Sequence, residues 1–376
     1  MTFRERIMAV FQGKQTDIIP WFADLTYWYS AQIAKGTLPE KYAGDGVVQL
    51  YRDLRVGAHE HVLNSPWETE YHEVEIKVEY EKDLSGKPVK ERIEWKTPAG
   101  SLVQVKEYVS RAYTWGYREY PVKNARDLEV LRFIYEHQEI KPNYEVQKKQ
   151  IELFGEWGVA SSVPPRSPMA QLFVVWMGVM NTSFALADAP SEIEKTLEVL
   201  AKSDDPIYEV ICSSPAPLVY FGENITGEVV SPGIFEKYYA PYYRRRSEQI
   251  HKAGKYIFLH IDGTMRAILP LVGKTGVDCA QSLTPAPVGD VEVEEMRRLA
   301  GPQLILWGGV PGAFFSPVYS EKELADIVLR CINFYKNDSK FMLCVCDQVP
   351  PDGEIERVKM VSELVEKYGV RQAGVV

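Results

Sequence analysis

The chain has 376 residues, of which 45% are hydrophobic and 25% are charged, a composition typical of an ordinary globular protein. Lysine and arginine number 43 against 52 aspartate and glutamate, so the formal net charge is −9, which argues against binding to nucleic acid or to an anionic membrane. No apolar run reaches about 18 residues, the start lacks the apolar core of a signal peptide, and five cysteines are too sparse for a disulfide framework, so we expect a cytoplasmic protein without a membrane span.

The first 66 residues alternate between helical and extended patterns. An amphipathic stripe over Thr2–Phe11 predicts a helix, and the apolar run Ile18–Phe22 predicts a short strand. A second helix is expected over Val47–Leu54. The less apolar segment Ala58–Asn64 is interpreted as a second strand.

Residues 67–120 have a different texture. Glu73–Tyr80, Arg92–Lys96 and Leu102–Val109 alternate polar and apolar residues with period two, and turn-forming segments separate them. This pattern predicts antiparallel hairpins with one solvated face. We interpret them as an insertion or lid within a single domain that covers residues 1–376.

After Asp127 the pattern becomes a repeated strand and helix. The helix over Ser231–Ala253 has Ser231 as its predicted N-cap and Pro232 at its first position. Together with the two strands near the N-terminus, eight core strands are expected, which favours a (β/α)8 TIM barrel with an inserted β-hairpin region. A doubly wound open sheet is the alternative, weakened by the lack of a Gly-rich dinucleotide fingerprint. The six later strands are predicted at Gly158–Val163, Pro217–Gly222, Tyr256–His260, Gly276–Gln281, Gln303–Gly308 and Phe341–Cys346.

The strand at Tyr256–His260 carries the strongest chemical signal. Side chains two apart on a strand share a face, so His260 and Asp262 are expected to leave its carboxyl end together. Such a pair is a candidate for metal ligation or proton transfer. In the alternative interpretation, His260 caps a core strand and Asp262 is the N-cap of a helix at Met265–Val272.

The other strand ends add polar groups that a barrel gathers at one mouth. Cys346 is nearest the end of the last strand, and zinc held by His260, Cys346 and a carboxylate, Asp262 or Glu223, is a candidate site. Glu228 is either a carboxylate aimed into the mouth or a loop charge, and Arg166 is either a guanidinium that binds an anionic group at the mouth or a surface residue. His59 and His61 would make only a weak metal pair, and exposed strand positions are the preferred interpretation. The strand ends contribute Asp24, Glu223, Asn224, Gln281, Trp307 and Asp347.

Four segments together resemble a known family. The chain resembles the uroporphyrinogen decarboxylase superfamily, in particular its corrinoid-linked methyltransferases and O-demethylase components. The resemblance implies a (β/α)8 barrel with its site at the carboxyl mouth. The segments that carry it are Phe221–Tyr242, His260–Gly263, Pro285–Asp290 and Asp347–Asp352.

Two departures from the family pattern shape the functional expectation. The family's decarboxylases carry arginines after the first strand to bind substrate carboxylates, whereas Trp21–Trp28 contains none. The superfamily's zinc methyltransferases use His-x-Cys and a later Cys. Here Asp262 takes the first Cys position, and Cys346 lies one residue from the second.

We therefore expect a methyltransferase that moves a methyl group between a small methylated substrate and a corrinoid on a separate protein. His260, Asp262 and Cys346 are expected as metal or acid groups, with Glu223 as a further catalytic residue. One alternative is a decarboxylase, which an arginine cluster near Arg166 and Arg266 would favour; another is a non-catalytic barrel of a methyltransferase complex. A homodimer is compatible with the sequence. The predicted substrate-binding residues are Asn224, Glu228, Arg166, Gln281 and Trp307, with Trp21, Tyr27 and Tyr220 lining a pocket for a flat substrate such as a methoxylated phenol.

Overall fold

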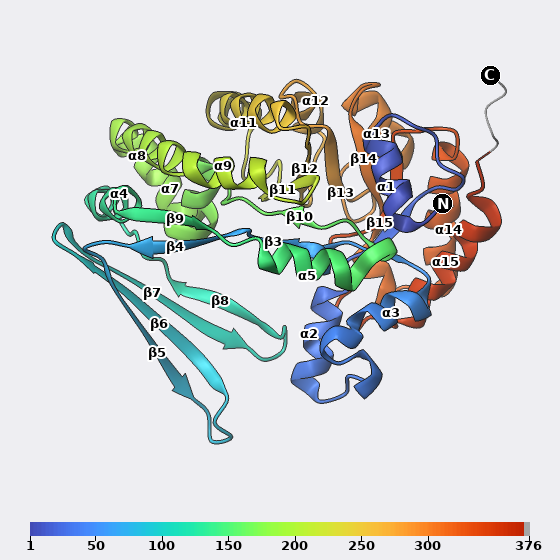
Figure 1. Ribbon diagram of the computed structural model, residues 1–376, viewed down its shortest axis with the longest axis horizontal. Coiled ribbons are helices and arrows are strands. Elements are labelled where there is room, and N and C mark those ends of the chain that lie inside the picture. Colours follow the sequence, from blue (N-terminus) through green and yellow to red (C-terminus); the bar gives the residue numbers. More distant parts are fainter. Residues whose placement is uncertain (372–376) are drawn as a thin grey trace. The chain divides into compact units, whose positions relative to one another are not determined.

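The computed structural model describes residues 1–371 and divides into two compact units (Figure 1). The first unit contains Met1–Pro66, Tyr144–Pro164 and the chain from Ile211 onward; the second contains Trp67–Asn143 and Pro165–Val210. Within residues 1–371, none of the helices combines the length and the apolar content that crossing a membrane requires.

A curled, parallel, nine-stranded sheet forms the centre of the first unit, in the order β2-β1-β15-β14-β13-β12-β11-β10-β3. A parallel bridge between Ala58 and Gly158 joins the chain at β2 to the chain just before β10, so the two ends of the sheet meet. The strands are β1 (Trp21–Ala23), β2 (Gly57–Ala58), β3 (Leu63–Asn64), β10 (Ser161–Ser162), β11 (Leu218–Ile225), β12 (Tyr256–Ile261), β13 (Cys279–Leu283), β14 (Ile305–Pro311) and β15 (Phe341–Cys346).

Helices of this unit, among them α11 and α15, surround the strands (Figure 1). The predicted N-cap is confirmed, because the Ser231 hydroxyl accepts the backbone N–H of Ile234 at 3.3 Å. The helices are α1 (Phe3–Phe11), α2 (Thr26–Lys35), α3 (Val47–Leu54), α5 (Glu145–Phe154), α10 (Pro232–Ile234), a π-helical turn (Phe235–Tyr239), α11 (Ala240–Lys252), α12 (Leu269–Val272), α13 (Val293–Ala300), α14 (Glu321–Tyr335) and α15 (Glu356–Tyr368).

The interior of the curled sheet is filled by alternate residues of its strands. A strand sends successive side chains to opposite faces, so every second residue points inward. On β1 the inward residue is Phe22, which packs edge-on against Trp307 of β14 with ring centroids 5.4 Å apart. Tyr220, Phe258, Trp307, Cys344 and Cys346 belong to the same buried core.

The second unit confirms the predicted antiparallel hairpins, which form a sheet in the order β5-β6-β7-β8. A separate antiparallel pair joins β4 and β9. Its strands are β4 (Trp67–Tyr71), β5 (Glu75–Lys82), β6 (Pro88–Thr97), β7 (Gly100–Val109), β8 (Thr114–Glu119) and β9 (Gln138–Pro142). Its helices are α4 (Asp127–Glu136), α6 (Pro168–Ala170), a π-helical segment (Gln171–Trp176), α7 (Gly178–Asp188) and α8 (Pro190–Ser203), and α9 (Asp205–Ser213) continues into the first unit.

Several predicted elements differ from the structure in extent: the strand predicted at Gly158–Val163 is reduced to β10, and the helix predicted over Ser231–Ala253 is interrupted by the π-helical turn. Two further differences concern residues near the candidate site. The expected strand Ala58–Asn64 is broken into β2 and β3 by a 3-10 turn at Glu60–Val62. The expected helix Met265–Val272 is shortened to α12 (Leu269–Val272), and the backbone N–H groups of Met265 and Arg266 donate instead to the Asp290 carboxylate. Asp262 is therefore not the N-cap of that helix.

Candidate functional site

His260 lies near the carboxyl end of β12 and is only 3% exposed. Its Nδ1 is 2.7 Å from the carboxamide oxygen Oε1 of Gln281 on the neighbouring strand β13. Because that oxygen can only accept, Nδ1 carries the hydrogen and Nε2 is left for the other side. Nε2 lies 3.4 Å from Oδ1 of Asp347, directly after β15. The fold thus orients an imidazole between an amide and a carboxyl.

Asp347 is the more accessible member of this pair, with a side chain that is 43% exposed. Partial burial raises the pKa of Asp347 above its ordinary value; His260 and His59 oppose this shift, and the Asp262 carboxylate adds to it. Two carboxyls close together cannot both ionise freely. The structure therefore brings His260 and Asp262, the pair predicted from the sequence, to a common neighbour in Asp347.

The 3-10 turn after β2 supplies a second imidazole and carboxyl. Nδ1 of His59 is 3.0 Å from Oε1 of Glu60. Burial raises the pKa of Glu60 to about 7, and Asp347 adds to that shift, whereas His260 and a hydrogen bond with Tyr220 oppose it. Burial lowers the pKa of His59 to about 4, so its imidazole is neutral at neutral pH.

Asp24, one residue after β1, is a third acid in this group and is 2% exposed. Its Oδ1 accepts the backbone N–H of Thr26 at 2.8 Å and the Thr26 hydroxyl at 2.6 Å. Burial raises the pKa of Asp24 to about 8, and the nearby Glu60 contributes. His59 opposes the pKa shift of Asp24 only in its protonated form, and at neutral pH its imidazole is neutral.

We call Asp24, His59, Glu60, His260 and Asp347 the acid cluster. Aromatic side chains pack around its buried residues. The His59 ring packs edge-on against Trp307, with centroids 4.6 Å apart. The predicted residue Tyr220 stands edge-on to both histidines, 6.0 Å from each ring. Such an enclosure removes water and so strengthens electrostatic effects on the acids.

The structure places the predicted zinc ligands without gathering them into a metal site. Sγ of Cys346 lies 3.4 Å from the carbonyl oxygens of both Leu283 and Cys344, either of which can accept its single S–H hydrogen. Among residues 1–371, no group of three or more His, Cys, Asp or Glu side chains is arranged to hold a metal ion. These residues therefore do not fit a zinc centre as they stand, and zinc stays a prediction.

Two sequence interpretations are wrong. Trp21 does not line the interior, because its indole N–H donates to Ser362 of α15 at 3.1 Å, on the helix-facing side of the sheet. His59 is not a surface residue, since it is 4% exposed and its ring packs on Trp307. Both errors concern which side of the sheet a residue occupies. The carboxamide oxygen of Gln281 is hydrogen-bonded to His260, so Gln281 orients the imidazole.

The remaining predicted residues occupy varied positions. Glu223 is buried on β11, and the next residue, Asn224, is exposed with a left-handed φ of 53°. Glu228 is exposed in the loop that follows, and its backbone N–H donates to Thr226. Tyr27 is half-buried on α2. Their roles in substrate binding stay predictions.

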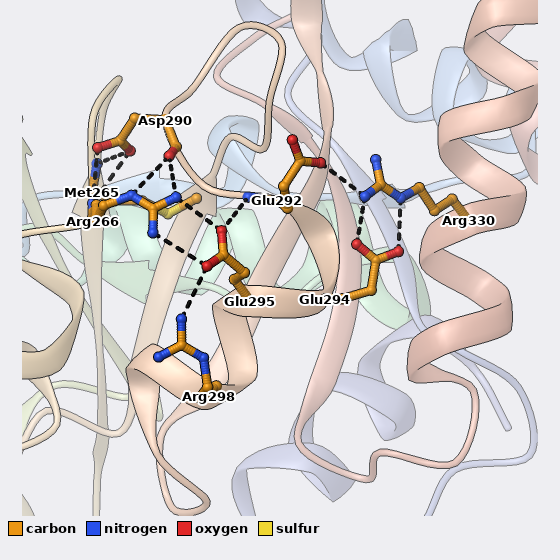
Figure 2. Close-up of polar contacts among 8 residues, drawn as sticks. All are labelled: Met265, Arg266, Asp290, Glu292, Glu294, Glu295, Arg298 and Arg330. Atoms are coloured by element: carbon orange, nitrogen blue, oxygen red, sulfur yellow. Dashed lines mark hydrogen bonds and ion pairs between the residues drawn. The ribbon is translucent and has the colours of Figure 1, made fainter.

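The two arginines that would favour a decarboxylase lie in different units of the structure. Arg166 belongs to the second unit, whereas Arg266 belongs to the first. Figure 2 shows Arg266 donating to the backbone oxygen of Asp290 and to the carboxylate of Glu295, each with a contact of 2.8 Å. Glu295 also binds Arg298. The guanidinium of Arg266 is thus occupied within the protein.

Sequence reasoning assigned no role to Glu60 or His59 and left Asp24 and Asp347 out of the proposed catalytic set. A usable signal existed for two of them: Asp347 directly follows the predicted strand Phe341–Cys346, and Asp24 lies two residues after the predicted strand Ile18–Phe22. For His59 and Glu60 the signal was weak, because the segment around them is neither fully apolar nor cleanly alternating.

Comparison with known proteins gives a family and a fold. The family model for uroporphyrinogen decarboxylase (URO-D) matches residues 166–368. A solved methyltransferase from Methanosarcina mazei matches at a TM-score of 0.61 and 12% identity, covering 98% of this chain and 99% of that one; at this identity the likeness shows the fold alone. A 3-dehydroquinate dehydratase from Geobacillus kaustophilus HTA426 covers 60% of this chain and 74% of its own at 15% identity, but its TM-score of 0.29 is too low to support a conclusion. No curated protein matches the chain in sequence.

Proposed function

Since the chain belongs to the uroporphyrinogen decarboxylase (URO-D) family, whose model matches more than half of it, we propose that it is a (β/α)8-barrel methyltransferase. It would move a methyl group between a small methylated substrate and a corrinoid carried by a separate protein. The likeness in fold to a methyltransferase over nearly the whole chain supports this proposal. The observation that carries it is the acid cluster, in which carboxyls with raised pKa values face an oriented imidazole.

Methyl transfer from an ether or amine needs a proton for the heteroatom that loses the methyl group. The pKa of about 7 leaves Glu60 about half protonated at neutral pH, which suits a general acid. In the proposed reaction the bond between the methyl carbon and the heteroatom breaks, the corrinoid of the partner accepts the methyl group, and the Glu60 proton passes to the heteroatom. Gln281 fixes the orientation of the His260 imidazole, which in turn faces the Asp347 carboxyl beside the site of transfer.

A porphyrinogen decarboxylase is the weaker candidate. Its substrate carries many carboxylates, which need matched cations. The segment Trp21–Trp28 offers no arginine, and the guanidinium of Arg266 is already bound to Glu295.

The test measures methyl transfer from 2-methoxyphenol to free cob(I)alamin, followed by the absorbance change of the corrinoid. We expect transfer with the wild-type protein and its loss in Glu60→Gln. The matched control is Glu294→Gln. It removes an exposed carboxylate that is paired with Arg330 and has no contact with the acid cluster among the described interactions. If the wild-type protein transfers no methyl group, and if both it and Glu60→Gln bind a corrinoid protein equally well, the chain is better explained as a non-catalytic component of a methyltransferase complex.

A further inference from the structure

Strand β5 (Glu75–Lys82) lies at the edge of the hairpin sheet in the second unit (Figure 1). Within residues 1–371 it pairs with β6 alone, so no strand lies along its other side. The backbone N–H and C=O groups of such an edge readily accept a further strand. The opposite edge strand, β8, is blunted, because it is shorter, contains Gly116 and pairs with β7 across a register irregularity.

The same strand leaves a stripe of large apolar side chains in contact with solvent. Ile76, Val78 and Tyr80 are 40%, 47% and 51% exposed, and they lie on one side of the sheet because alternate residues of a strand share a face. The stripe continues into β6, where Trp95 stands opposite Ile76 and Ile93 stands opposite Val78. Single exposed apolar residues are ordinary on a protein surface, whereas a row of three along an unpaired edge is typical of a surface that another chain covers.

The order of residues along β5 makes the strand complementary to a second copy of itself. When two copies pair antiparallel about a twofold axis at Val78, Lys77 of each copy stands opposite Glu79 of the other. On the apolar face, Ile76 of each copy stands opposite Tyr80 of the other. Cross-strand pairs of both kinds stabilise a sheet. A shift of two residues in either direction puts Lys77 opposite Lys77 or Glu79 opposite Glu79 at the axis.

This alignment contains one kind of like-charged pair, Glu75 with Glu81, and each of these carboxylates has a lysine of β6 beside it. Nζ of Lys90 lies 2.7 Å from Oε1 of Glu81, and Lys96 stands opposite Glu75 in the sheet. The repulsion between the two glutamates is therefore reduced by cations that each copy already supplies.

We propose that the chain forms a homodimer in which the β5 strands of two copies pair antiparallel about a twofold axis at Val78, so that their hairpin sheets become one continuous sheet. The pairing is closed, because each copy uses its exposed β5 edge in the contact. It concerns the second unit and is independent of the chemistry proposed for the first. One pair of strand edges buries an area at the low end of specific interfaces, so we expect a dissociation constant on the order of 10 µM.

The experiment is sedimentation velocity on the full chain from about 1 to about 200 µM, a range that brackets the expected dissociation constant. The wild-type protein should shift from monomer to dimer across this range. Val78→Lys brings two ammonium groups together at the axis and should raise the dissociation constant at least about tenfold. Val179→Lys is the matched control, because Val179 on α7 of the same unit is 46% exposed, and this variant should dimerise like the wild type.

Charge exchange tests the register of the pairing. Lys77→Glu alone sets two glutamates against each other on both sides of the axis, and Glu79→Lys alone does the same with two lysines. Each variant by itself should dimerise at least about tenfold more weakly than the wild type. An equimolar mixture of the two variants restores both opposite-charge pairs and should dimerise within about threefold of the wild type. Recovery in the mixture excludes misfolding as the cause of the loss in each variant.

Three outcomes would overturn the proposal. A wild-type chain that stays monomeric up to the highest concentration would show that β5 does not pair with a second copy. Loss of the dimer in Val179→Lys, with no effect of Val78→Lys, would place the contact on α7. A mixture of Lys77→Glu and Glu79→Lys that dimerises no better than either variant alone would contradict the alignment about Val78.

Discussion

Two regions of the first unit are rich in charge, and they differ in almost every physical respect. In the acid cluster, Glu60 has a pKa raised to about 7 and Asp24 has one raised to about 8, mainly through burial. In the network of Figure 2, hydrogen bonding to Arg266 lowers the pKa of Glu295 to about 2, and hydrogen bonding to Arg330 lowers that of Glu294. The same residue types are thus shifted in opposite directions.

The difference shows what separates a structural ion network from a reactive one. The arginine network ties the loop around Asp290 to helices α13 and α14 while remaining in contact with solvent, and hydrogen bonds from arginines lower the pKa values of Glu294 and Glu295. The acid cluster removes carboxyls from water without pairing them to a guanidinium. Such carboxyls retain protons near neutral pH, which makes them usable as acids.

The largest contrast is expected in activity. Glu60→Gln should lower the rate of methyl transfer by about 100-fold or more, because the amide cannot deliver a proton to the leaving heteroatom. Steady-state rates at pH 7, with circular dichroism as a check of folding, measure this. Glu292→Gln, which alters the network instead, should stay within about twofold of the wild type. A similar loss in both variants would remove the distinction between the regions.

The pH dependence of the reaction sharpens the same point. Because Glu60 acts in its protonated form, the rate should fall as the pH rises through about 7, and by about tenfold per pH unit well above that value. The groups that face Glu60 are His59, Tyr220, His260, Asp347 and Asp24. A rate that stays level from pH 6 to pH 9 would contradict the role of Glu60.

Protein stability should report Asp24 independently of catalysis. The folded pKa of Asp24 is raised from 3.8 to about 8, so between these values the native state holds a proton that the unfolded state has lost. The free energy of unfolding should therefore fall as the pH rises through this window, by up to about 1.4 kcal/mol per pH unit from this group. Asp24→Asn should flatten that slope in denaturant titrations. A wild-type curve that rises over the same window and is unchanged in the variant would argue against a buried neutral acid.

Substitution of Cys346 shows whether a thiol takes part in the reaction proposed for the acid cluster. Sγ of Cys346 lies beside the carbonyl oxygens of Leu283 and Cys344, so Cys346→Ala should keep methyl transfer within about threefold and cost about 1 kcal/mol of stability from lost packing. Elemental analysis of wild-type and variant protein accompanies the rates. Stoichiometric zinc that disappears together with activity in Cys346→Ala would restore the predicted zinc site.

The smallest effects belong to the arginine network. Arg266→Ala removes contacts that are exposed to solvent, and exposed ion pairs contribute little to stability. We expect a small fall in the melting temperature at low salt, a still smaller one in 1 M sodium chloride because of screening, and an unchanged rate of methyl transfer. A large loss of activity in this variant would show that the arginine network holds residues at the carboxyl ends of the strands in the positions that the reaction needs.

Much of the fold was predictable because it depends on local patterns. The buried apolar runs at Tyr256–Ile261 and Phe341–Cys346 predict parallel strands, and period-two alternation predicts the hairpins of the second unit. The candidate site was predicted only in part. His260 and Asp262 were found from spacing, whereas Glu60 was missed because a 3-10 turn, rather than a regular strand, carries it inward.

The sequence by itself determined the alternation of strands and helices, the likeness to the uroporphyrinogen decarboxylase family, and the polar residues that end each strand. Only the tertiary structure decided that Trp21 faces a helix while Trp307 faces the interior, and that His59, Glu60 and Asp24 meet beside His260. The physical reason is that hydrophobic periodicity is a property of neighbours along the chain. The pKa of a carboxyl depends instead on how much water the whole fold removes from it and on which charges, distant in sequence, are brought close.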